Sequence, residues 1–229
     1  MENDEQLVFV GRSILESEIA RLSEAGKTAT LCDCDLQGLN LSQYDLSDWH
    51  FEKCKLAGCF FNGAQLERTI FSGCRASGSS FVSAVLTEAV IDGGDFSNST
   101  FRGATLASMK IAHCKMTGAD FSETQAMGFE VEDVLFVFGL LPKMSFRKMT
   151  LKQIDFSEAD LRSCDFRETV FEECSLRDAN LSDCRFEHAD LRGADLGGVK
   201  LTDAKRFKGA LISKRQAADL LSQLGLQIQ

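Results

Sequence analysis

Two segments, ADLRSCDF (residues 159–166) and HADLRGADL (residues 188–196), show the same pattern: a small residue, a polar residue and then Leu or Phe, recurring every five positions. Extended from Leu31 to Leu201, the five-residue step gives 35 positions, of which 16 are Leu and 13 are Phe. The remaining six are also apolar: Ala76, Ile91, Ile111, Met116, Ala126 and Val131. Neither a helix, with a period of 3.6, nor a simple strand, with a period of 2, produces this spacing.

A second series, mostly of small residues, lies two positions before each large apolar residue. Residues two apart point to the same side of an extended segment, so each five-residue unit offers one small and one large side chain to an interior. The other three positions are polar and rich in Asp, Ser, Arg, Glu and Gly. The pattern therefore predicts short extended segments with one buried and one solvated side.

This unit resembles that of the pentapeptide-repeat family, A(D/N)LXX, over residues 31–201. The resemblance implies an all-β solenoid, a right-handed quadrilateral β-helix in which each unit forms one side of a square and four units complete a coil. The 35 units then give about nine coils, with short N- and C-terminal cap helices. Caps are expected because the ends of a solenoid expose unpaired strand edges.

The expected organisation has three parts: an N-terminal cap-helix region (1–30), the repeat β-helix (31–205), and a C-terminal helix and strand for dimerisation (206–229). Ser13 is predicted to cap a first helix that runs to about Ala25, with Gly26 as its stop. Ser213 is predicted to cap a second helix, whose Leu221 and Leu224 cover the last coil.

Composition excludes several classes of protein. The net charge of −9 argues against direct nucleic-acid binding, which needs a basic surface. The acidic start, MENDEQ, lacks the features of a signal peptide, and the longest apolar run, residues 134–141, is too short to span a membrane. We therefore expect a cytoplasmic protein with reduced cysteines and no membrane association.

The sequence contains no recognisable catalytic, metal or cofactor site, and we expect a binding protein rather than an enzyme. The three histidines are scattered at outward positions. Cys32 alone lies outside the small inward series, so the thiols are expected to be core residues rather than zinc ligands or a redox pair. The cysteines within the series are Cys34, Cys54, Cys59, Cys74, Cys114, Cys164, Cys174 and Cys184.

Carboxylates are concentrated between Asp155 and Asp195, which hold twelve acidic residues and five arginines. When the repeats are folded four to a coil, most of the carboxylates without a nearby arginine in the pattern lie on one side of the coils. The next side adds two more acids. The candidate partner-binding residues are Asp155, Glu158, Asp160, Asp178, Asp183 and Asp195. Two interpretations remain open at this stage: a partner-binding wall, or acids that only solvate the solenoid.

The segment 127–149 departs from the pattern because Leu135, Val137, Phe138 and Leu140 occupy outward positions. Either the coil is distorted and these residues repack, or they form an exposed patch for a partner. A distorted coil is the expectation favoured by the sequence.

The C-terminal segment RQAADLLSQLGLQIQ (215–229) and the approach DLGGVKL (195–201) resemble pentapeptide proteins that protect topoisomerases: the Qnr, MfpA, albicidin-resistance and microcin B17 immunity types. GADFSETQAM (118–127) and SFRKMTLKQIDFSEADL (145–161) are similar to the albicidin-resistance type. The resemblance implies a DNA mimic that binds DNA gyrase or topoisomerase IV and counters a poison. It also implies an end-to-end homodimer through Leu220, Leu221, Leu224, Leu226 and Ile228. The alternative is a protein–protein scaffold or regulator unrelated to gyrase.

Overall fold

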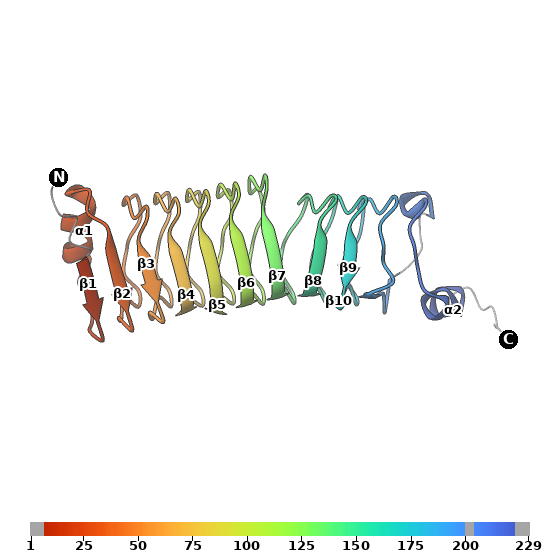
Figure 1. Cartoon of the computed structure of the whole chain (residues 1–229), viewed down its shortest axis with the longest axis horizontal. Coiled ribbons are helices and arrows are strands. Elements are labelled where there is room, and N and C mark those ends of the chain that lie inside the picture. Colours follow the sequence, from red (N-terminus) through yellow and green to blue (C-terminus); the bar gives the residue numbers. More distant parts are fainter. Residues whose placement is uncertain (1–6, 200–203, 223–229) are drawn as a thin grey trace. The chain divides into compact units, whose positions relative to one another are not determined.

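The computed structural model describes residues 7–199 and 204–222. The fold is an all-parallel, right-handed β-solenoid of about nine coils with two helices, as the repeat predicts (Figure 1). The chain divides into two compact units, residues 1–130 (unit 1) and residues 131–229 (unit 2). The same five-residue repeat builds the coils of both units.

Each repeat is held by hydrogen bonds to the next coil and by one local turn. In the repeat centred on Leu56, the Leu56 N–H donates to the Arg75 carbonyl at 2.7 Å, and the Gly58 N–H donates to the Ser77 carbonyl at 3.1 Å. The turn is closed by the Cys59 N–H, which donates to the Leu56 carbonyl at 3.1 Å. The coils therefore satisfy one another's backbone groups.

The corners of the coils require a left-handed backbone conformation. The residue two positions after the large apolar residue has a positive φ through almost the whole repeat, from 50° at Lys53 to 75° at Gly198. Glycine adopts this conformation freely, whereas side chains with a Cβ meet a steric penalty. Outside glycine, these positions hold almost only polar residues, many of them Asp, Glu, Ser, Gln or Lys.

Unit 1 begins with a strand and a helix, β1 (Leu7–Val10) and α1 (Glu16–Glu24). The strands that follow are β2 (Ala29–Cys32), β3 (His50–Glu52), β4 (Ile70–Arg75), β5 (Val90–Asp95) and β6 (Lys110–Lys115). From β2 to β6 each strand pairs in parallel with the next at a register of four repeats, or one full coil. Leu31 thus lies opposite Phe51, and Phe51 opposite Phe71. The repeat pattern gave no sign of β1, which pairs with β2.

Unit 2 contains the later strands and the second helix, except that Glu130, the first residue of β7, belongs to unit 1. Its elements are β7 (Glu130–Leu135), β8 (Thr150–Asp155), β9 (Val170–Glu172), β10 (Cys174–Ser175), β11 (Ala194–Asp195), the 3-10 helix η1 (Ala204–Phe207) and α2 (Lys214–Ser222). Their pairing is again parallel, with Val134 opposite Ile154 and Ser175 opposite Asp155.

Columns of phenylalanine fill the interior. In unit 1, Phe61, Phe81, Phe101 and Phe121 stack with ring centroids 4.7–4.8 Å apart. In unit 2, Phe146, Phe166 and Phe186 stack at 5.1 Å, and Phe207 continues the column at 4.9 Å. The spacing follows the separation of neighbouring strands, so one ring per coil fills the interior without a gap.

Polar side chains can occupy the buried positions of the small series because each donates a hydrogen bond to a backbone carbonyl. Thr69, Ser79 and Thr169 are buried, and their hydroxyls donate to carbonyls 23 residues earlier at 2.8, 2.6 and 2.7 Å. Cys59 does the same at 2.9 Å, and burial raises the pKa of its thiol to about 11. All eight cysteines of the series are buried, and Cys32 is half-buried. The assignment of these thiols to the core is confirmed.

Helix α1 starts later than the sequence predicts. Its N-cap is Leu15, whose N–H donates to Glu18 Oε2 at 2.9 Å, whereas Ser13 forms a parallel bridge with Asp35. The predicted Ser13 cap is therefore wrong, because that residue extends the first coil. At the other end the Lys27 N–H donates to the Leu22 carbonyl at 2.9 Å, and Gly26 supplies a φ of 62°.

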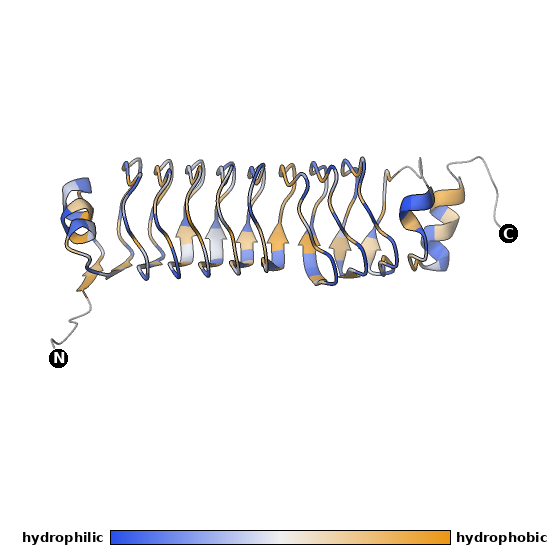
Figure 2. Cartoon of the chain, turned by 90° about the horizontal axis from the view of Figure 1, so that it is seen from above, coloured by the Kyte–Doolittle hydropathy of each residue, from blue (hydrophilic) through white to orange (hydrophobic). Residues whose placement is uncertain are grey.

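Helix α2 is capped as predicted. Ser213 and Gln216 bond reciprocally, with the Ser213 N–H 2.7 Å from Gln216 Oε1 and the Gln216 N–H 3.2 Å from Ser213 Oγ. The buried Gln216 amide also donates to the carbonyls of Leu191 and Ala194, both at 2.7 Å. Figure 2 shows the hydrophobic and hydrophilic sides of α2. Helix α2 thus donates hydrogen bonds to backbone carbonyls of the solenoid that a further coil would otherwise satisfy.

The last coil is one residue longer than a regular coil of four repeats. Phe207, not Arg206, stacks on Phe186, and Leu211 bridges Asp190. The regular register of four repeats therefore slips by one position here, and the coil runs on to Leu211. The sequence pattern ends at Leu201 because this shift takes later residues out of its register.

The coil distortion predicted for residues 127–149 is not found over residues 134–149, which lie in unit 2. Phe136, Leu141 and Phe146 are buried, and the Gly139 N–H closes a regular turn on the Phe136 carbonyl at 2.8 Å. Val134 and Met144 fill the small positions as buried residues. Because larger residues fit inside a regular coil, the outward apolar side chains have no reason to repack.

We expect the Phe166→Ala substitution to lower the free energy of unfolding by about 3–5 kcal/mol, because rings above and below keep the cavity open. The exposed Glu172→Ala substitution should cost well under about 1 kcal/mol. Chemical denaturation of both variants measures the difference. Similar losses at both positions would contradict the assignment of inward and outward residues.

Candidate partner-binding surface

The acidic wall comprises Asp155, Glu158, Asp160, Asp178, Asp183 and Asp195, all in unit 2. Asp155 pairs in register with Ser175, and Ser175 pairs with Asp195. These three residues form one column over three successive coils. The column places two carboxylates on the same side of the solenoid, separated by a serine.

Glu158 and Asp178 form a second column, at the turn of the same side. The Glu158 N–H donates to the Arg177 carbonyl at 2.9 Å, and the Asp178 N–H donates to the Gly197 carbonyl at 2.8 Å. Both residues are exposed and left-handed, with φ of 57° and 55°. The next residue of the column is Gly198, where an added Cβ would lie 1.9 Å from Asp178 Oδ1. Glycine thus leaves room for the Asp178 carboxylate.

The other two acids lie on the adjoining side. Asp160 begins that side, directly around the corner from Glu158, and bridges to Asn180 of the next coil. Asp183 lies at the far turn of the adjoining side, with φ of 61°. The structure therefore groups five of the six acids and places Asp183 apart from them.

Arginines neutralise half of the acidic wall. Asp195 accepts from Arg177 Nη2 at 2.8 Å, Asp160 accepts from Arg162 Nη2 at 2.8 Å, and Asp183 accepts from Arg206 Nη2 at 2.8 Å. Partial burial raises the pKa of Asp195, but the Gly197 N–H and Arg177 outweigh it, and the net pKa lies below its usual value. The Asp195 carboxylate therefore stays charged at neutral pH, and the paired arginines partly cancel the negative charge of all three acids.

Two carboxylates of the wall are left without compensation. Within residues 7–199 and 204–222, neither Glu158 nor Asp178 makes a side-chain hydrogen bond or ion pair. In the same ranges, the Asp155 carboxylate has no ion pair but is hydrogen-bonded, because its Oδ1 accepts from the Ser157 N–H at 2.9 Å and from Ser157 Oγ at 2.5 Å. The unbalanced negative charge is thus concentrated on the turn column. Sequence reasoning could not separate these acids, since it does not show which arginine each one meets.

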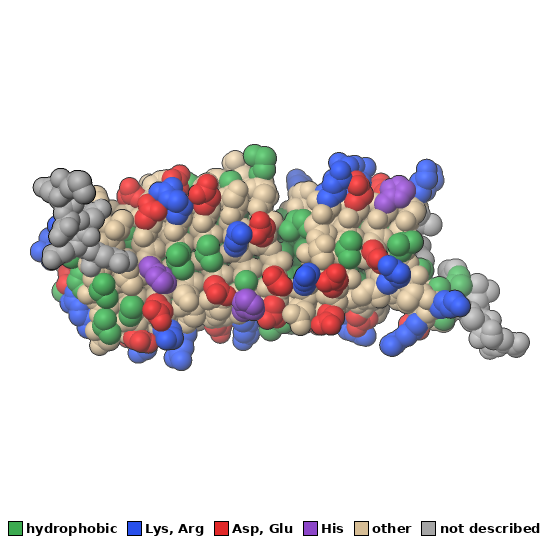
Figure 3. All heavy atoms as spheres, viewed as in Figure 1, with side chains coloured by type: hydrophobic (Ala, Val, Ile, Leu, Met, Phe, Trp, Pro, Cys, Tyr) green, Lys and Arg blue, Asp and Glu red, His purple; other side chains and the backbone are tan. Residues whose placement is uncertain are grey.

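The excess of acidic over basic residues is larger in unit 1 than in unit 2, although the acidic wall lies in unit 2. Unit 1 holds 18 acidic and 10 basic residues, whereas unit 2 holds 16 and 15. On the opposite side of the unit 2 coils, the side of Phe146, Phe166, Phe186 and Phe207, seven basic residues outnumber three acidic ones. Both signs are also interspersed on the face shown in Figure 3. The acidic wall is therefore a local feature of one side.

The predicted dimerisation residues are only partly described. Leu220 is buried, and Leu221 is 38% exposed. Leu220 thus points inward from α2, and the covering of the last coil by Leu221 stays a prediction. Leu224, Leu226 and Ile228 lie outside the described residues.

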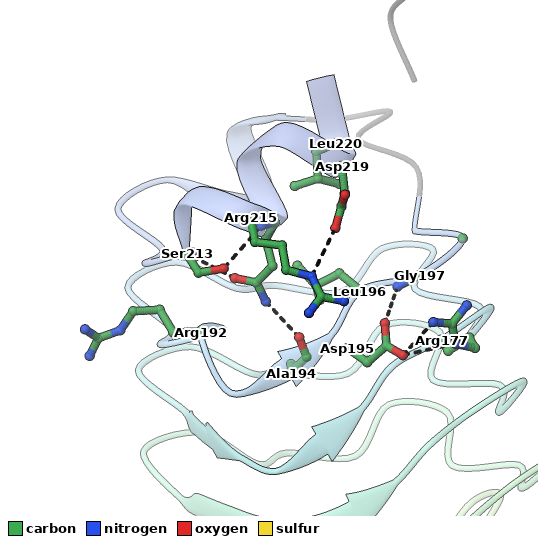
Figure 4. A pocket seen from close by; sticks show the side chains of 12 residues that line it. Arg177, Arg192, Ala194, Asp195, Leu196, Gly197, Ser213, Arg215, Asp219 and Leu220 are labelled. Atoms are coloured by element: carbon green, nitrogen blue, oxygen red, sulfur yellow. Dashed lines mark hydrogen bonds and ion pairs between the residues drawn. The ribbon is translucent and has the colours of Figure 1, made fainter. Parts of the chain in front are cut away.

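A polar cavity of about 490 Å³ lies beside the start of α2 (Figure 4). Its charged lining is largely paired, with Arg177 bound to Asp195 and Arg215 Nε 4.0 Å from Asp219 Oδ2. In the part of the chain that the structure describes, no three His, Cys, Asp or Glu side chains are grouped as metal ligands would be. No described helix has the length and apolar character needed to cross a membrane. The wall, rather than the cavity, is the stronger candidate surface.

Comparison with known proteins agrees with the repeat. A model described as the pentapeptide repeat region matches residues 44–121, and one described as pentapeptide repeats (8 copies) matches residues 145–178, 154–193 and 179–210. No curated protein sequence matches the chain.

Among solved structures, a trypsin-treated variant of QnrB1, a plasmid-mediated fluoroquinolone resistance protein, is similar with a TM-score of 0.64 and 20% identity over 98% of each chain. Full-length QnrB1 is similar with a TM-score of 0.59 and 21% identity, over 96% of this chain and 98% of QnrB1. At this identity the likeness establishes the fold.

Proposed function

Since the chain belongs to the pentapeptide-repeat family, we propose that it is a DNA-mimicking protein that binds DNA gyrase or topoisomerase IV and protects the enzyme from a poison. The observation that carries the proposal is the turn column of uncompensated carboxylates, Glu158 and Asp178, on a solenoid similar in fold to a fluoroquinolone resistance protein. The C-terminal resemblance to topoisomerase-protecting proteins points the same way.

The spacing of the wall suits this role. Successive coils are about 4.8 Å apart, as neighbouring strands are, and B-DNA carries a phosphate about every 3.4 Å along each strand. Over the two coils of Glu158 and Asp178 the wall carries at least one carboxylate per coil, which approaches that linear charge density without equalling it. The basic side opposite would be repelled by a positively charged DNA-binding surface. The two sides together would orient the protein, so that the wall faces its partner.

Reversing the turn column tests the wall. We expect the double variant Glu158→Lys and Asp178→Lys to weaken binding to purified gyrase by about tenfold or more, with loss of poison protection in a supercoiling assay. Stability should hardly change, because both side chains are exposed and lysine already occupies this left-handed position at Lys53, Lys143 and Lys148. Wild-type binding should weaken steeply with salt.

The matched control is the double variant Asp133→Lys and Glu173→Lys, with the same charge change at the same turn position on the neighbouring side. It should retain binding and protection. Equal losses in both variants would show that net charge, not the wall, governs binding. A wild-type protein that never binds gyrase or topoisomerase IV would leave the scaffold alternative.

We also propose a homodimer through the C-terminus, in which Leu221 joins Leu224, Leu226 and Ile228 against a two-fold mate. Truncation after Ser222 keeps α2 and its Gln216 contacts, so the last coil stays covered. We expect light scattering to give a monomer for this variant and a dimer for the full chain. A truncated protein that is still dimeric would place the interface elsewhere.

A further inference from the structure

Three apolar side chains, Leu135, Phe138 and Leu140, point outward from the first coil of unit 2; we call them the apolar patch. Each lies one coil before an acid of the wall. Leu135 pairs in register with Asp155, and Leu140 bridges to Asp160. Phe138 holds the turn position that Glu158 holds in the next coil, and its N–H donates to the Ser157 carbonyl at 3.1 Å. The patch and the acidic wall are therefore one continuous surface within unit 2.

The fold does not need the apolar patch. Leu135, Phe138 and Leu140 are 43%, 55% and 41% exposed, while their chain neighbours Phe136 and Leu141 are fully buried and fill the interior. Single exposed apolar residues are ordinary on a protein surface. Three that lie close in sequence within one coil, beside the acidic wall, are the kind of feature that marks an interaction site.

The backbone at Phe138 gives an independent reason. Phe138 has φ of 58°, in the left-handed region that disfavours bulky side chains. Among the 23 non-glycine residues with positive φ in the described parts of the chain, Phe138 is the only apolar one. Neither core packing nor turn chemistry accounts for phenylalanine at this position, where Gly, Asn or Asp would fit better. Strain of this kind is typical of functional positions.

We propose that the apolar patch is the hydrophobic anchor of the acidic wall, and that the partner is a protein whose basic surface adjoins an apolar recess that receives Phe138. The proposal rests on the proposed function, and it adds what the partner must offer. A partner surface that recognised only phosphate-like charge would gain no affinity from exposed leucine and phenylalanine. An aromatic side chain seated in a recess contributes affinity that salt does not screen.

The test uses the full chain, purified gyrase and the Phe138→Gly variant. Glycine relieves the left-handed strain, so the variant should be at least as stable as the wild type in thermal unfolding. Its affinity for gyrase should nevertheless fall by about 10-fold or more, while the slope of affinity against salt concentration stays as in the wild type. Phe138→Asn, which also suits the backbone, should reproduce the loss.

The control is Phe60→Ser, which removes another exposed phenylalanine, in unit 1 and 47% exposed, and should leave affinity unchanged. If the wild type binds gyrase and Phe138→Gly binds equally well, the anchor is refuted while the proposed function stands. If the wild type does not bind gyrase, the proposed function fails, and the anchor proposal fails with it. Binding of the wild type to vesicles of neutral phospholipid that Phe138→Gly abolishes, with gyrase binding unaffected, would also overturn the proposal.

Discussion

The structure depends on one constraint: each coil must present its backbone groups to the next coil at a fixed register of four repeats. The hydrogen bonds from Leu56 to Arg75 and from Gly58 to Ser77 are one instance of a scheme that recurs along both units. That register fixes the corners, where a left-handed residue turns the chain, and it stacks like positions into columns. Interior phenylalanines, inward thiols and outward carboxylates are all consequences of this stacking.

The same constraint explains how much the sequence predicts. A five-residue period in large apolar residues is sufficient for the fold, for the eight inward cysteines and for the side on which each wall acid lies. Ser213 could be identified as a cap because N-capping needs only local spacing, whereas the reciprocal bond from Gln216 was not predicted. These features follow from periodicity or from short-range chemistry.

Other features escaped prediction for physical reasons. The strand β1 is a short apolar run without periodicity, and Ser13 serves a bridge to Asp35 that no local pattern indicates. The register shift before Phe207 depends on one extra residue in the last coil. The pairing of Asp195 with Arg177, against the isolation of Asp178, depends on side-chain directions that spacing does not define. The period alone gives the outward position of Phe138, but it does not show that the turns of residues 134–149 stay regular, because outward apolar residues favour repacking.

The account joins two neighbouring contributions within unit 2: uncompensated charge at Glu158 and Asp178, and an apolar patch that includes Phe138. Both require that equivalent positions of successive coils lie directly above one another. The most direct test is the pair Glu158→Cys and Asp178→Cys under mild oxidation, since neighbouring strands bring Cα atoms within the usual disulfide range of about 4.4–6.8 Å. We predict that mass spectrometry finds a disulfide between these two positions, and none in the pair Glu158→Cys and Asp183→Cys, which lies on different sides. Equal cross-linking of both pairs, or none in the first, would contradict the account.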